Sequence, residues 1–255
     1  MTLVKANGQV YGLVVAAGVG SRFGGHQPKQ YAQVAGKTIL EHGLLRLAQS
    51  NQLKHLYLVV AKDDGIAPQL VQNLTDDVSF CVPITLVEGG KERWQSVWQG
   101  VIAIANAGAD PNDLVLIHDA ARPCVAVDDI HSVLAVAHQQ PYGAILATPV
   151  ADTLKKVDAH GQIQQTIQRQ NLWQAQTPQV FRLKELQHVL SYVNKQNIAT
   201  QSSHITDEAS GFEQLGLPIY VVEGSRSNIK LTYPSDLQMI EALLSIHIKH
   251  PSISR

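Results

Sequence analysis

The chain has 255 residues, of which 45% are hydrophobic, so it is long enough to bury one sizeable core. Its 20 basic and 21 acidic residues give a formal net charge of −1, and this balance excludes binding to DNA, RNA or an anionic membrane through overall charge. The two cysteines form no CxxC pair, and no apolar stretch approaches the ~20 residues of a membrane helix. We therefore expect a cytoplasmic protein with a single domain over residues 1–255 and no nucleic-acid or membrane partner.

Short apolar runs alternate with amphipathic stretches up to Pro149. Thr38, followed three residues later by Glu41, is typical of a helix N-terminus. Near-continuous apolar strands separated by helices indicate an α/β, Rossmann-like fold, in which helices cover both faces of a mostly parallel sheet. The pattern predicts strands at 11–16, 55–61, 114–118 and 143–148, and helices at 38–49 and 92–105.

The pattern changes after Pro149, where residues 153–157 and 162–168 predict a polar β-hairpin. This hairpin belongs to a protruding arm at about 151–175. The arm has too little apolar surface to be stable alone, so it either lies on its own domain or packs against a second subunit. Regular α/β patterning then returns, through 183–195, 218–223, a short strand at 228–232 and a last helix from Pro234 to about Ile246.

A glycine-rich turn follows the first predicted strand, and it reads Ala16-Ala17-Gly18-Val19-Gly20-Ser21-Arg22. Such a turn at the carboxyl edge of a parallel sheet binds phosphates, because glycines let backbone N–H groups approach an anion. The turn is no dinucleotide fingerprint, since its spacing is G-x-G-x-x-x-G, and no P-loop, since His26 stands at the lysine position. Arg22 and Lys29 flank it, and two fixed cations there would neutralise charge that develops on a triphosphate.

Asp119 ends a buried strand, at the sheet edge where α/β proteins bind their ligands. A carboxylate there suits Mg²⁺, which takes a few carboxylate and phosphate oxygens together with water. A helix cap or an ion pair with Arg122 is the alternative. For His118 we expect packing or hydrogen bonding rather than catalysis. Asp207 and Glu208 are adjacent and point in different directions on a helix, so we do not expect them to form an acid–base pair.

Eight segments along the chain form one recognisable series: the glycine turn, Pro28-Lys29-Gln30-Tyr31, Gly89–Val97, His118–Pro123, Asp152-Thr153, Thr177-Pro178-Gln179, Ile205–Ala209 and Asn228-Ile229-Lys230. Their order resembles that of the 2-C-methyl-D-erythritol 4-phosphate cytidylyltransferase family of the non-mevalonate isoprenoid pathway. The resemblance covers nearly the whole chain, from about Gly12 to Leu244. It implies a homodimer that exchanges the arm between subunits, and an enzyme that transfers CMP from CTP to 2-C-methyl-D-erythritol 4-phosphate and releases pyrophosphate.

The resemblance also implies roles for individual residues. Catalytic cations are Arg22, Lys29 and Lys230, and Asp119 is a ligand of Mg²⁺ or a similar divalent cation. The nucleotide is bound by Ala16, Ala17, Gly18, Gly20, Gly90, Arg93, Ser96 and Ala120, and the acceptor by Arg122, Thr153, Arg169, Thr177 and Thr206.

Some of these assignments have structural alternatives. Lys91 stands where the family often has an acidic residue, which puts a side-chain role at that position in doubt. Ser96 is alternatively a solvent-facing helix residue, and Thr206 alternatively caps the helix that begins at Asp207.

Three other functions compete with this interpretation. A ribitol 5-phosphate cytidylyltransferase shares the glycine turn and the segment around Arg122, but Ala121 and the run Thr206–Ala209 favour the methylerythritol enzyme. A transferase for hexose 1-phosphates with UTP or dTTP is disfavoured by the Thr-Pro-Gln and Asn-Ile-Lys segments. A non-catalytic nucleotide-binding module would bind CTP without releasing pyrophosphate.

Overall fold

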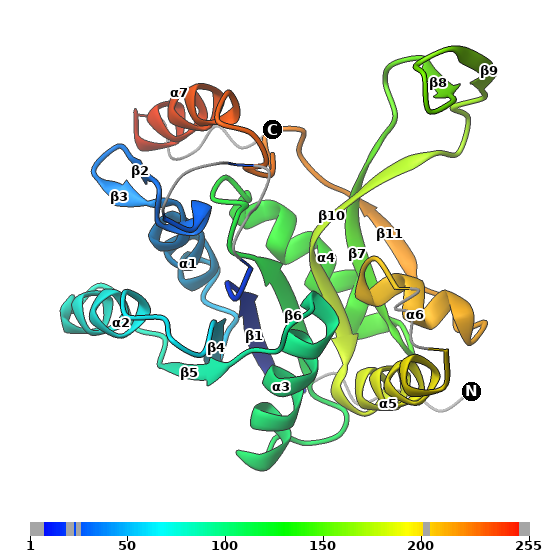
Figure 1. Cartoon of the computed structure of the whole chain (residues 1–255). Coiled ribbons are helices and arrows are strands. Elements are labelled where there is room, and N and C mark those ends of the chain that lie inside the picture. Colours follow the sequence, from blue (N-terminus) through cyan, green and yellow to red (C-terminus); the bar gives the residue numbers. More distant parts are fainter. Residues whose placement is uncertain (1–7, 19–22, 24–26, 201–204, 250–255) are drawn as a thin grey trace.

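A seven-stranded sheet forms the centre of the computed structural model, which describes residues 8–18, 23, 27–200 and 205–249 (Figure 1). The strands run in the order β11-β7-β10-β6-β1-β4-β5, and β10 alone is antiparallel to its neighbours in this sheet. Their bounds are β1 Val10–Val15, β4 His55–Val60, β5 Ile84–Glu88, β6 Leu114–Asp119, β7 Gly143–Pro149, β10 Trp173–Arg182 and β11 Tyr220–Glu223.

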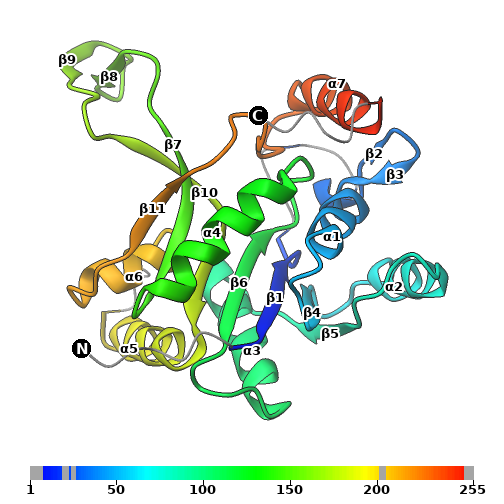
Figure 2. The same ribbon diagram turned by 180° about the vertical axis from the view of Figure 1, so that it is seen from behind.

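Helices cover both faces of this sheet, as the sequence predicted (Figures 1 and 2). One face packs against α1 (Ile39–Gln49), α2 (Ala67–Asp76) and α4 (Val127–Gln139). The other packs against α3 (Arg93–Asn106), α5 (Leu183–Thr200) and α6 (Glu208–Gln214). A third apolar cluster lies under α7 (Asp236–Lys249), beside the short strands β2 (Gln33–Val34) and β3 (Lys37–Thr38). The α/β, Rossmann-like fold is therefore confirmed.

The first helix begins where the sequence predicted. Thr38 Oγ1 accepts a hydrogen bond from the Glu41 backbone N–H at 3.1 Å, and the Glu41 carboxylate accepts one from the Thr38 N–H at 2.7 Å. This reciprocal capping box satisfies donors that a helix leaves open at its first turn. Leu40, Leu44 and Leu47 repeat at helical spacing and are fully buried, so the helix is held against the sheet by one apolar side.

One expectation from the sequence is corrected. Residues 228–232 form no strand: Leu231 N–H bonds to the Ala121 carbonyl at 2.8 Å, but no ladder continues from it. The mostly parallel sheet is confirmed, and β10 is its antiparallel strand because it returns from the arm beside β7, the strand that leads into it. A chain that leaves the sheet and comes straight back must run antiparallel.

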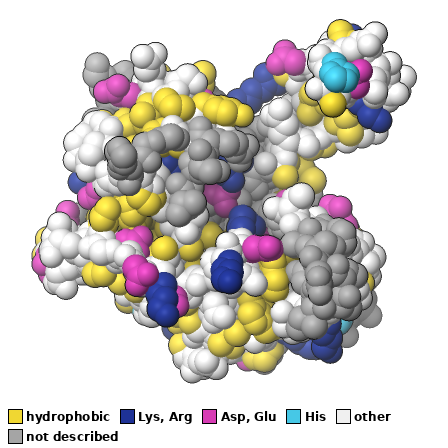
Figure 3. All heavy atoms as spheres, viewed as in Figure 1, with side chains coloured by type: hydrophobic (Ala, Val, Ile, Leu, Met, Phe, Trp, Pro, Cys, Tyr) yellow, Lys and Arg dark blue, Asp and Glu magenta, His cyan; other side chains and the backbone are white. Residues whose placement is uncertain are grey.

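The predicted arm is present, with β8 (Leu154–Val157) paired to β9 (Ile163–Ile167). It projects beyond the body of the molecule (Figures 1 and 3), and hydrophobic side chains lie on its surface. Val157 is 49% exposed, Ile163 60% and Trp173, at the start of β10, 42%. In the described part of the chain no helix combines the length and the apolar character needed to cross a membrane.

Candidate functional site

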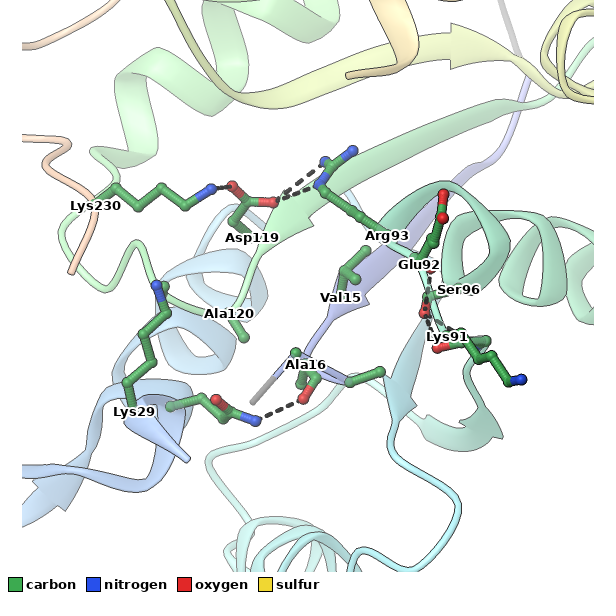
Figure 4. A pocket seen from close by; sticks show the side chains of 15 residues that line it. Val15, Ala16, Lys29, Lys91, Glu92, Arg93, Ser96, Asp119, Ala120 and Lys230 are labelled. Carbon is green, nitrogen blue, oxygen red and sulfur yellow. Dashed lines mark hydrogen bonds and ion pairs between the residues drawn. The ribbon is translucent and has the colours of Figure 1, made fainter. Parts of the chain in front are cut away.

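A pocket opens at the carboxyl ends of β1 and β6, the edge of a parallel sheet where ligands bind in α/β folds. Its walls come from five parts of the chain: the ends of these two strands, the 3₁₀ turn η1 (Lys29–Tyr31), the start of α3 and the segment around Lys230 (Figure 4). The lining residues are Val15, Ala16, Ala17, Gly18, Lys29, Gln30, Gly90, Lys91, Glu92, Arg93, Ser96, Asp119, Ala120, Ala121 and Lys230.

The floor of the pocket is held in place by η1. The buried Gln30 side-chain amide donates to the Ala16 carbonyl at 2.6 Å, which fixes the backbone where β1 ends. Tyr31 is buried next to it, and its hydroxyl donates to Asp64 at 2.6 Å. Lys29 Nζ donates to the Leu231 carbonyl at 2.6 Å. One short turn thus ties the glycine turn to the segment that carries Lys230.

The start of α3 forms the opposite wall. The Gly90 N–H donates to Ser96 Oγ at 3.1 Å, and Ser96 is only 2% exposed, so the solvent-facing alternative for Ser96 is wrong. A Cβ at Gly89 would lie 2.7 Å from Ala17 Cβ, and one at Gly90 would lie 2.3 Å from Gln95 Cβ. Glycine is therefore required at 89 for this loop to pass between Ala17 and Ser96, and at 90 for the loop to fold back against Gln95.

Asp119 lies at the centre of a chain of ion pairs. Arg93 approaches Asp119 Oδ1 with Nε and Nη2, both at 3.2 Å, while Lys230 Nζ lies 2.6 Å from Oδ2 (Figure 4). Arg93 Nη1 also lies 2.6 Å from Glu208 Oε1. Burial alone would raise the pKa of Asp119, but Arg93 and Lys230 outweigh it and hold that pKa below its usual value. The carboxylate therefore stays ionised.

A buried network supports Asp119 from behind. The Asp119 N–H donates to Thr177 Oγ1 at 3.0 Å, and Thr177 Oγ1 lies 3.1 Å from His118 Nδ1. His118 Nε2 lies 2.9 Å from the Arg122 carbonyl, so it carries the ring proton and leaves Nδ1 to accept from Thr177. His118 is fully buried, and its side chain makes the hydrogen bonds that the sequence analysis expected in place of catalysis.

A second pocket lies on the other side of Lys230. Arg122 lines it, and its Nη1 donates to the Asn228 carbonyl at 2.5 Å. Asn228 is fully buried and in turn donates to the Thr177 carbonyl at 2.8 Å, so the irregular segment that carries Lys230 is docked onto β10. The other lining residues are Thr148, Pro149, Val150, Ala151, Asp152, Leu154, Gln174, Ala175, Gln176, Arg226, Ile229 and Lys230.

Most of the predicted site residues meet in these two pockets. The first holds Lys29, Lys230, Asp119 and every predicted nucleotide residue except Gly20, which with Arg22 lies outside the described residues. Lys91 also lines it, but its side chain points away from Asp119 (Figure 4). Among the predicted acceptor residues, Arg122 lines the second pocket.

The other predicted acceptor residues do not line either pocket, although Asp152 and Leu154, the neighbours of Thr153, line the second. Thr153 and Arg169 are exposed on the arm, and Thr177 is buried behind Asp119. Thr206 lines a small separate pocket with Glu92 and Glu208. Its alternative role as a helix cap is wrong, because the side chain of Asp207 accepts the Ser210 N–H at 3.0 Å.

Four polar residues of the site received no role from the sequence. Gln30 and Asn228 lie inside motifs that the sequence analysis recognised. Their amide side chains can hydrogen-bond to the backbone, and this was the feature that could have identified their role. Glu92 accepts from the Trp94 indole at 2.8 Å and caps α3. Glu208 was considered only as a partner of Asp207, and nothing in the sequence pairs it with Arg93.

The side chains of the first pocket suit a divalent cation only when a bound nucleotide supplies further oxygen ligands. In the described ranges no group of three or more His, Cys, Asp or Glu side chains is arranged to hold a metal. Asp119 contributes a single carboxylate, already shared between Arg93 and Lys230. Mg²⁺ is commonly held by one or two carboxylates together with substrate phosphates and water, so Asp119 fits such an ion when a nucleotide supplies the phosphates.

Comparison with known proteins gives one consistent family. Residues 10–246 match the family described as IspD, 2-C-methyl-D-erythritol 4-phosphate cytidylyltransferase. Proteins with that name from Psychrobacter cryohalolentis and Psychrobacter arcticus are 47% and 48% identical to this chain over 277 and 275 residues, 95% of the chain in both cases and 94% and 93% of theirs. A crystal structure of 4-diphosphocytidyl-2C-methyl-D-erythritol synthase is 34% identical, with a TM-score of 0.78, covering 93% of this chain and 99% of that one.

His118 makes the stability of the fold depend on pH. Burial lowers its pKa from 6.5 to about 4 in the folded protein, so between pH 6.5 and pH 4 His118 is protonated in the unfolded chain and neutral in the folded one. The contribution of the neutral His118 ring to the free energy of unfolding is therefore complete above pH 6.5 and is lost as the pH falls. Between pH 7 and pH 5 we expect His118 to account for a loss of about 2 kcal/mol.

The check is urea unfolding at both pH values for wild type, His118→Gln and His160→Gln, since His160 is exposed on the arm. His118→Gln is expected to lose less stability on acidification than wild type, and His160→Gln as much as wild type. Equal losses in wild type and His118→Gln would contradict the assignment.

Proposed function

The chain belongs to the 2-C-methyl-D-erythritol 4-phosphate cytidylyltransferase family, and we propose that the two pockets beside Lys230 are the nucleotide and acceptor halves of its active site. The protein is a nucleotidyltransferase of isoprenoid precursor biosynthesis. It transfers CMP from CTP to 2-C-methyl-D-erythritol 4-phosphate and yields 4-diphosphocytidyl-2-C-methyl-D-erythritol and pyrophosphate.

The first pocket takes CTP. The backbone of Ala16 to Gly18 lies against the triphosphate, where its N–H groups face anionic oxygens. Gly90, Ser96 and Arg93 at the start of α3 contact the nucleoside. Lys29 and Lys230 supply fixed positive charge, and Arg22 of the same loop adds to it. Asp119 would hold Mg²⁺ or a similar cation, which would neutralise phosphate charge during the transfer.

The second pocket takes the acceptor phosphate. Arg122 suits it because a guanidinium binds two phosphate oxygens at once. One acceptor oxygen forms a bond to the α-phosphorus of CTP while the bond to the β-phosphate oxygen breaks and pyrophosphate leaves. The acceptor phosphate is ionised at neutral pH, so no general base is needed. The residues act by position and by charge.

One observation carries this assignment. Lys230 lines both pockets, so its ammonium lies where an acceptor oxygen from one side meets the phosphorus from the other. Charge develops at that point as the new bond forms, and a cation fixed there stabilises the transition state more than the separate substrates.

The activity is tested by pyrophosphate release. Purified protein with CTP and Mg²⁺ is expected to release pyrophosphate when 2-C-methyl-D-erythritol 4-phosphate is added, and not when ribitol 5-phosphate is added. Release with ribitol 5-phosphate alone would keep the chemistry but reassign the acceptor. CTP binding without release from either acceptor would favour a non-catalytic nucleotide-binding module.

Lys29 is expected to act on turnover rather than on folding. Lys29→Ala removes a cation from the triphosphate side of the pocket and should lower kcat by roughly 10²–10³, the usual effect of losing one such group. Lys37→Ala is the matched control, because Lys37 is exposed on β3 outside both pockets. Near-normal turnover of Lys29→Ala would refute the role.

We further propose that the protein is a cytoplasmic homodimer formed through the arm. Its substrate CTP is a cytoplasmic metabolite, and Cys81 and Cys124 are free thiols, as in a reducing compartment. The exposed Val157, Ile163 and Trp173 would be covered by a second subunit. Thr153 and Arg169, which are exposed on the arm, would then reach the acceptor pocket of the partner.

The dimer is tested by charging the apolar face of the arm. Val157→Asp combined with Ile163→Asp is expected to give a monomer in analytical ultracentrifugation. Its KM for the acceptor should rise roughly tenfold while CTP affinity is retained, because only the acceptor side uses the partner. Val78→Asp, at a residue that is 95% exposed and far from the arm, should change neither property. A wild-type monomer would overturn the proposal.

A further inference from the structure

Glu208 is the most deeply buried carboxylate in the described ranges, and the roles proposed so far do not include it. It is 1% exposed at the first residue of α6, and its Oε1 lies 2.6 Å from Arg93 Nη1. Its Oε2 is buried and has no hydrogen-bond partner among the described residues. Asp207 already caps α6, so the helix does not need the Glu208 carboxylate to begin.

Burying this carboxylate is costly, and stability alone accounts for it poorly. The free energy needed to remove two charged groups from water offsets most of the free energy gained from their attraction, so a buried ion pair is weak evidence for stability. Such a pair does fix geometry, because a hydrogen bond is stronger in a region of low dielectric and leaving a buried charged group unpaired there is costly. Glu208 therefore has to be explained by what it holds in place.

The group that it holds is Arg93. The guanidinium is divided between two carboxylates: Nη1 faces Glu208, while Nε and Nη2 face Asp119. Arg93 is the first residue of α3 and lines the nucleotide pocket. Asp119 is shared in turn with Lys230, the cation between the two pockets. The orientation of Arg93 thus sets how Asp119 and Lys230 face the pocket.

We propose that Glu208 is a positioning residue for the transfer reaction, acting through Arg93 on Asp119; this rests on the proposed assignment of Arg93 and Asp119 to the CTP site. Glu208 is the permanent partner of Arg93, and Asp119 is the exchangeable one. When Asp119 turns toward a nucleotide and its divalent cation, Glu208 keeps the guanidinium paired and in place. Without Glu208, Arg93 moves fully onto Asp119 and competes with the nucleotide for that carboxylate.

The test is a double-mutant cycle on pyrophosphate release with CTP and 2-C-methyl-D-erythritol 4-phosphate. Glu208→Gln keeps the shape of the side chain and removes its charge, and we expect kcat/KM for CTP to fall roughly tenfold. In an Arg93→Lys background the same substitution should change kcat/KM by less than about twofold, since the residue through which Glu208 acts is already lost. Glu213→Gln, on the exposed side of the same helix, is the matched control and should be silent.

A second readout does not depend on activity. The Arg93 Nη1 protons, which face Glu208, should exchange slowly with water in wild type and in Glu213→Gln and faster in Glu208→Gln, as read from the Arg93 side-chain signals in ¹⁵N NMR, assigned by their loss in Arg93→Lys. An unchanged Arg93 signal in Glu208→Gln, or a full tenfold loss in the Arg93→Lys background, would overturn the proposal. If wild type released no pyrophosphate, the function itself would fail, and the NMR comparison would still decide whether Glu208 positions Arg93.

Discussion

The site depends on one chain of ion pairs, in which Lys230 and Arg93 both hold Asp119 and Glu208 holds Arg93 from behind. These four residues come from a loop near the C-terminus, the start of α3, the end of β6 and the start of α6. Each charged group has an opposite charge within 3.2 Å, which makes its partial burial tolerable. A change in any one of them alters the electrostatics of the rest.

The strand order of the sheet determines which residues surround Asp119. The ends of the parallel strands β1 and β6 meet at one edge, so the glycine turn and Asp119 come to the same place. The antiparallel β10 then contributes Thr177, whose hydroxyl receives the Asp119 N–H, and the Thr177 carbonyl that receives the Asn228 amide. Asn228 thereby docks a segment without regular structure, and Lys230 two residues later meets Asp119 with a fixed approach.

Local signals explain what the sequence predicted well. The capping box of Thr38 and Glu41, the apolar periodicity of α3 and the end of the first strand before Ala16 each depend on neighbours within a few residues, and they lie as predicted. Long-range pairing explains what was missed. The solvent-facing alternative for Ser96 stayed open because its hydrogen bond to Gly90 spans a turn, and Glu208 was compared with its neighbour rather than with Arg93, 115 residues away in sequence. The direction of β10 likewise depends on where the arm leaves the sheet, which no local pattern records.

The central claim is that the Asp119 cluster is the place where CTP and its metal bind, and a crystal structure with CTP and Mg²⁺ tests it most directly. We expect a triphosphate over Gly18 and Lys29, with Asp119 turned toward the metal, Lys230 in contact with phosphate oxygens and Arg93 still paired with Glu208. A nucleotide bound elsewhere, with Asp119 still held between Arg93 and Lys230, would contradict it.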